Sequence, residues 1–227
     1  MQSSIQLRTN RRAALTLLAG AAALAGVGRI APALAGSAAR VTFGDSRMSI
    51  AFDDLLATRV AIAGGAAPLT GFAPSEVLRL ADGKRIERFL RTADSVRAIT
   101  DPAHGPGREQ TIVGRSSEGI EKAVRVGLFD RHPGFALMKV AYRNAGTAPV
   151  AVAGWTSSAH VVLPGAGGDR KAWTFAGASF ADRRDWIQPV LPNFDQRNFM
   201  GMNASDYGGG TPCSDVWRRD GGLAVGH

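Results

Sequence analysis

The sequence has a single cysteine, Cys213, and only four histidines among its 227 residues. One thiol cannot form an internal disulfide or a zinc site built from several thiolates, and no pair of histidines shows the His-Glu-x-x-His spacing of zinc peptidases. The net charge is +8, but the basic residues do not form a stripe interleaved with aromatic residues, as a nucleic-acid site would require. These shortages predict a protein without a metal or cofactor and without a nucleic-acid partner.

Acidic residues are missing from the first 35 residues, which contain four arginines. Arg11 and Arg12 precede a run of Ala, Leu and Gly that is too short for a comfortable membrane span. Ala33-Leu34-Ala35 then has the small-x-small pattern of a cleavage site. We therefore predict an export signal over residues 1–35, of the twin-arginine type. The alternative is a disordered basic leader or an uncleaved anchor.

An export signal has two consequences for the mature chain. Its removal takes away four arginines and no acid, which lowers the net charge of +8 by four. The protein is then expected in the periplasm or outside the cell, with the export machinery as a transient partner.

Helical spacing of apolar residues is missing after residue 36, where these residues alternate with polar or small ones. Val126 and Leu128 lie in one such run, and Met138 and Val140 lie in the next, across a Gly/Pro turn. One apolar and one polar face are typical of antiparallel sheets with one wet side. The pattern predicts an all-β domain over residues 36–227, an antiparallel β-sandwich with these four side chains inside.

Turn residues separate the expected strands. Ala81-Asp82-Gly83-Lys84 predicts a tight hairpin, because Asp-Gly adopts the positive φ values that such turns need. Residues 101–107 contain two prolines and two glycines and predict a loop. No βαβ periodicity is present, which excludes a Rossmann fold or a complete (β/α)8 barrel.

The last third of the chain is rich in aromatic residues, glycine and aspartate. Three segments stand out: Phe199-Met200-Gly201-Met202-Asn203, Ser205-Asp206-Tyr207-Gly208-Gly209-Gly210, and Asp215-Val216-Trp217-Arg218 followed by Gly221-Gly222-Leu223-Ala224-Val225-Gly226-His227. Residues 173–227, and more loosely 120–227, resemble the N-terminal region of bacterial α-galactosidase-like glycoside hydrolases of the melibiase type. Cys213-Ser214 departs from the small aliphatic residues expected there.

The resemblance implies a supersandwich-like β-sandwich followed by a (β/α)8 barrel that hydrolyses terminal α-galactosides with retention. In that family the aspartate nucleophile and the aspartate acid/base lie on the barrel, so the resemblance assigns no catalytic residue to this chain. The last expected strand ends on His227 without a closing turn. We therefore expect the natural protein to continue, and this truncated chain to be inactive by itself.

Four residues are candidates for sugar contacts. Asp206 and Tyr207 lie in a glycine-rich stretch, where a ring can pack on the C–H groups of a sugar while a carboxylate accepts hydrogen bonds from its hydroxyls. Trp186 and Trp217 can act in the same way, although a place in the core is the alternative for each.

The other two acids near the C-terminus favour structural roles. Asp215 lies on an expected strand, and we predict an ion pair with Arg218 or Arg219. Asp220 precedes two glycines and is expected in a turn.

The sequence thus favours the sandwich region of an exported α-galactosidase-like hydrolase, which supports the sugar site and binds an α-galactoside-type carbohydrate. A homo-oligomer is compatible with this role. The alternative is a stand-alone exported carbohydrate-binding β-sandwich without catalysis, and a third hypothesis is a purely structural or adhesive β-domain.

Overall fold

The structure is a computed structural model that describes residues 40–64, 68–163, 171–175, 187–191, 193–194 and 213–226. The expected export signal, with Arg11, Arg12, Ala33 and Ala35, lies outside the described residues and stays a prediction. Within the described residues every regular element is a β-strand, and no helix is present that could cross a bilayer. The prediction of an all-β domain is confirmed for the described residues.

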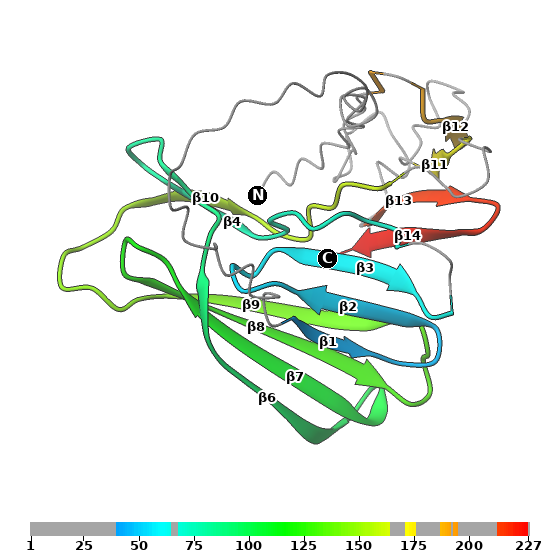
Figure 1. Cartoon of the computed structure of the whole chain (residues 1–227), viewed down its shortest axis with the longest axis horizontal. Helices are drawn as coiled ribbons and strands as arrows, with labels where there is room; N and C mark the ends of the chain where they lie inside the picture. Colours follow the sequence, from blue (N-terminus) through cyan, green and yellow to red (C-terminus); the bar gives the residue numbers. More distant parts are fainter. Residues whose placement is uncertain are drawn as a thin grey trace, which may run out of the picture.

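The strands form antiparallel sheets (Figure 1). The first sheet contains β1 (Val41–Gly44), β2 (Met48–Phe52) and β3 (Thr58–Ile62). The second contains β10 (Val152–Thr156), β4 (Val77–Leu80) and β5 (Arg85–Ile86). The largest contains β6 (Leu90–Asp101), β7 (Gly105–Arg115), β8 (Ile120–Phe129) and β9 (Ala136–Asn144). The fourth contains β12 (Ile187–Pro189), β11 (Trp173–Phe175), β13 (Cys213–Arg218) and β14 (Gly221–Gly226).

Strands β8 and β9 confirm the alternation read from the sequence. Val126 pairs with Met138 and Val124 pairs with Val140, so that their side chains share one face of the sheet. Val126 and Leu128 are fully buried, and Met138 and Val140 are partly buried against the same core.

The core lies where the β1–β3 sheet and the largest sheet meet. One apolar cluster contains Phe43, Phe52 and Val60 from the first sheet together with Ile112 and Val124 from the largest sheet. Burying side chains of this size stabilises a fold by roughly 1.5–3 kcal/mol each. These two sheets therefore form two layers around a shared core.

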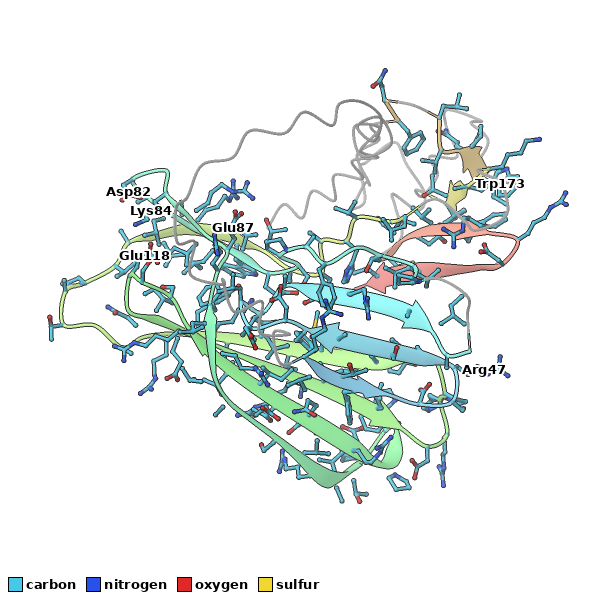
Figure 2. All side chains as sticks on the ribbon, viewed as in Figure 1. Arg47, Asp82, Lys84, Glu87, Glu118 and Trp173 are labelled. Carbon is cyan, nitrogen blue, oxygen red and sulfur yellow. The ribbon has the colours of Figure 1, made fainter. Side chains whose placement is uncertain are left out.

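The predicted hairpin over residues 81–84 is confirmed. Gly83 has a φ of 86°, and the Lys84 N–H donates to the Asp82 carboxylate at 2.9 Å. The Lys84 ammonium then pairs with Glu118 at 2.8 Å, which links this turn to the turn between β7 and β8 (Figure 2).

The loop predicted over residues 101–107 is wrong in extent. Strand β6 continues to Asp101 and β7 begins at Gly105, so the turn covers only residues 102–104. The Asp101 carboxylate accepts the N–H groups of Ala103 and His104, and Gly105 takes a φ of 80°. Pro106 is tolerated because it lies at the start of the strand, where no ladder hydrogen bond depends on its nitrogen.

Candidate functional site: an aromatic face of the C-terminal sheet

The β13–β14 hairpin presents two different faces. Because side chains alternate along a strand, Val216 and Arg218 are buried while Trp217 between them is 36% exposed. The hairpin turns at Arg219 and Asp220, which confirms the predicted turn position of Asp220. Trp217 is thus held on a two-stranded ladder with its ring directed away from the buried side.

Two tryptophans stack on this exposed face. Trp173 of β11 is the direct register partner of Trp217 on β13, and directly opposed side chains share a face. Their ring centres are 5.3 Å apart with an angle of 24° between the planes. Figure 2 shows Trp173 at β11, next to the β13–β14 hairpin. Gly222 pairs with Trp217 on its other side, so β14 places no side chain against the indole there.

Polar contacts of Asp215 hold β11 against β13. The Asp215 carboxylate accepts the Phe175 N–H at 2.7 Å, and its backbone carbonyl accepts the Thr174 hydroxyl at 2.6 Å. Thr174 is itself buried. These bonds fix the spacing of the two strands and with it the stacking distance of the tryptophans.

Of the two partners predicted for Asp215, Arg218 or Arg219, the first is wrong, because Arg218 pairs with Asp220. The Arg218 guanidinium binds the Asp220 carboxylate, with Nε 2.8 Å from Oδ1, and also donates to the Leu163 carbonyl. Asp215 and Arg218 are three residues apart on one strand, so their side chains point to opposite faces, whereas the turn brings Asp220 beside Arg218. The guanidinium also lowers the pKa of Asp220.

The inner face of the hairpin borders a small cavity of about 20 Å³. Its lining includes Ser158, His160, Val216 and Leu223. Burial lowers the pKa of His160 to about 4, so this imidazole is neutral near pH 7. The volume suits about one water molecule and is far too small for a sugar ring, so this cavity is not a carbohydrate site.

A second cluster of functional groups lies in the core. Glu76 and Lys122 are 1% and 0% exposed, and the Lys122 ammonium lies 4.6 Å from the centre of the Phe89 ring. Glu76 Oε1 accepts the Ser158 N–H at 2.8 Å, but Glu76 Oε2, Lys122 Nζ and the Tyr142 hydroxyl have no hydrogen-bond partner within the described part of the chain.

Burial dominates the titration of this cluster. Desolvation raises the pKa of Glu76 to about 7 and lowers that of Lys122 to about 8, and it raises the pKa of Tyr142 above its ordinary value. Since the polar atoms of these side chains are buried, we assign the cluster no part in substrate binding.

Of the four predicted contact residues, only Trp217 lies among the described residues. Trp217 lies on the exposed aromatic face, whereas Trp186, Asp206 and Tyr207 lie outside the described residues and stay predictions. Trp173 was not among the predicted contact residues. The alternation of Trp173 and Phe175 around Thr174 marks a strand, but only the pairing of β11 with β13 shows that the two indoles meet. No group of three or more potential metal ligands occurs among the described residues.

Comparison with models of known protein families finds no match to this chain, and a search of curated proteins finds none either.

Proposed function

We propose that this chain is the β-sandwich region of an exported α-galactosidase-like glycoside hydrolase and that it supplies contacts to a sugar, not catalytic groups. The observation that carries the proposal is the stacked Trp173–Trp217 pair, which presents indole surface within the segment that resembles this family. The C–H groups of a galactoside pack well on such a surface.

The two layers around one core support a sandwich of the supersandwich kind. Phe52 from β2 and Val124 from β8 belong to the same apolar cluster, as expected where two sheets face each other. In this proposal the sandwich is a rigid support, and the aromatic face of the C-terminal sheet contacts the sugar.

The acids of the described C-terminal sheet have structural partners. Asp215 binds the Phe175 N–H, and Asp220 binds Arg218. Retaining hydrolysis needs two carboxyl groups about 5 Å apart across one sugar, one of them free to attack carbon. In our proposal Asp206, with Tyr207 and Trp186, adds polar and aromatic contacts beside Trp217, and the catalytic acids belong to a barrel.

The proposed location follows from residues 1–35. Arg11 and Arg12 would direct the chain to a twin-arginine exporter, and cleavage after Ala35 would release the mature protein. N-terminal sequencing of the exported protein tests this part: a product that begins near Gly36 supports it, and a cytoplasmic product that begins at Met1 contradicts it.

A stand-alone carbohydrate-binding sandwich is the second candidate, because the stacked pair could bind a sugar without a second domain. The two candidates differ in affinity. A site that lacks one wall should bind only in the millimolar range, about −4 kcal/mol, whereas a complete binding module should reach the micromolar range, about −8 kcal/mol.

Titration of the purified chain with methyl α-galactoside, followed by the NMR signals of the indole N–H groups, tests the proposal. We expect millimolar binding that shifts the Trp173 and Trp217 signals and that Trp217→Ala abolishes. Trp155→Ala, which removes an exposed tryptophan on β10, is the matched control and should bind like the wild type. Absence of any shift, or equal loss in both variants, would contradict the proposal.

A further inference from the structure

Strand β6 is the outermost strand of the largest sheet, whose order is β6-β7-β8-β9 (Figure 1). It is 12 residues long, about twice the usual strand length. Its first residues are covered, since the Arg91 N–H donates to the Asp54 carbonyl at 2.8 Å. Along the rest of β6, no strand in the described part of the chain pairs with the outer edge. Such an edge offers backbone N–H and C=O groups to a further strand.

The central part of β6 is also open on both of its faces. All side chains from residue 92 to residue 98 are exposed, although successive side chains point to opposite sides of a sheet. In β8 of the same sheet, by contrast, most side chains are buried. Val96 lies within the open stretch and is 55% exposed. An apolar side chain, an open edge and two open faces therefore coincide on the same residues.

The sequence of β6 does not protect this edge. Long edge strands usually carry a proline or a lysine that prevents pairing with another chain, and residues 92–100 contain neither. Their two charged residues, Asp94 and Arg97, have opposite signs, so two copies of the stretch have no net repulsion. The β-bulge of this strand lies at its covered beginning, between Arg91 and Ala93.

We propose that β6 pairs antiparallel with β6 of a second copy around a two-fold axis at Val96, which joins two four-stranded sheets into one. Outward N–H and C=O groups occur on every second residue, so a symmetric pairing must place one residue opposite itself. An axis at Arg97 would set two guanidinium groups opposite each other, which is unfavourable. With the axis at Val96, Arg97 is opposite Ser95 and Asp94 is opposite Ala98, and no like charges meet.

Light scattering coupled to size exclusion, applied to the purified chain over a dilution series, tests this pairing. The wild type should have twice the mass of one chain. Val96→Lys places two ammonium groups opposite each other at the axis and should weaken the dimer at least about tenfold. Val152→Lys, at a similarly exposed valine on β10, is the matched control and should remain dimeric. A monomeric wild type, or a dimer that both variants affect equally or that neither affects, would overturn the proposal.

Cysteine cross-linking tests the register even if Val96→Lys fails to fold. Directly opposed residues of antiparallel strands have Cα atoms about 4.5–5.5 Å apart, within the range of a disulfide. In a Cys213→Ser background, Val96→Cys should therefore form a covalent dimer on mild oxidation. Ala98→Cys, on the same face but opposite Asp94 of the second copy, should not. Cross-linking at both positions to the same extent, or at neither, would contradict the axis at Val96.

Discussion

The layers around β8 and the sheet around β13 use large apolar side chains in opposite ways. In the first region Phe52 and Phe89 are completely enclosed, together with Leu56 and Ile112. In the second, Trp217 and Ile187 are exposed, and buried polar contacts from Thr174 and Arg218 hold the strands in place. The comparison shows that the first region is organised for stability, while the second presents its aromatic surface outward, where a ligand can contact it.

The largest expected effect concerns the enclosed aromatic residues. Phe52→Ala should lower the free energy of unfolding by about 3–5 kcal/mol, because it removes buried contacts and leaves a cavity. Trp217→Ala removes a larger ring from the C-terminal sheet but should cost less than about 1.5 kcal/mol, because that ring is partly exposed. Chemical denaturation of both variants checks the comparison. Equal losses would show that the C-terminal sheet is as much a part of the core as β2.

The second prediction concerns the charged groups inside the first region. Between pH 4.5 and about 7 the unfolded chain loses the Glu76 proton while the folded chain keeps it, so the contribution of Glu76 to stability falls as the pH rises. His160, whose pKa burial lowers to about 4, contributes an opposite rise up to about pH 6.5. Between about pH 8 and 10.5 the folded chain has lost the Lys122 proton that the unfolded chain still holds, so stability rises again. Each change should amount to at most about 3 kcal/mol.

Denaturation midpoints measured across the pH range check this dependence. Relative to Glu76→Gln, the wild type should lose stability between pH 4.5 and 7, whereas relative to Glu121→Gln, which changes a half-buried acid on β8, it should show no such change. A difference between the wild type and Glu76→Gln that stays constant over this range would contradict the assignment.

The third prediction concerns the junction of the two regions. Gly221 has a φ of 146°, which residues with a side chain rarely adopt, and a Cβ atom there would also displace the end of the Ile62 side chain of β3. Gly221→Ala should therefore destabilise the protein by about 1–3 kcal/mol. Gly83 also has a positive φ, but a Cβ atom there would meet open space. Gly83→Ala should therefore lower the free energy of unfolding by only about 1 kcal/mol. If the two variants unfold alike, the β13–β14 hairpin does not rest on β3.

Local patterns in the sequence were sufficient for the first region. Alternation predicted which side chains of β8 and β9 face the core. Asp82-Gly83 predicted the hairpin between β4 and β5. The same alternation places Lys122 on the face of Val124 and Val126, although its charge suggests a surface position. The electrostatic influence of Glu76 on Lys122 could not be predicted, because only the packing of distant strands brings the two groups near each other.

The candidate site was less predictable because it depends on pairing between distant strands. Trp173 and Trp217 are separated by more than 40 residues, and nothing in either segment specifies that β11 lies beside β13. The pairing of Arg218 with Asp220 instead of Asp215 could have been predicted, since residues three apart on a strand point to opposite faces.

Turnover of a chromogenic α-galactoside by the purified chain shows whether these residues contact a sugar without catalysing its hydrolysis. We expect no turnover above the buffer rate, in the same preparation that shows millimolar sugar binding. Robust turnover that Asp206→Ala abolishes would contradict the account and would place a complete active site within this chain.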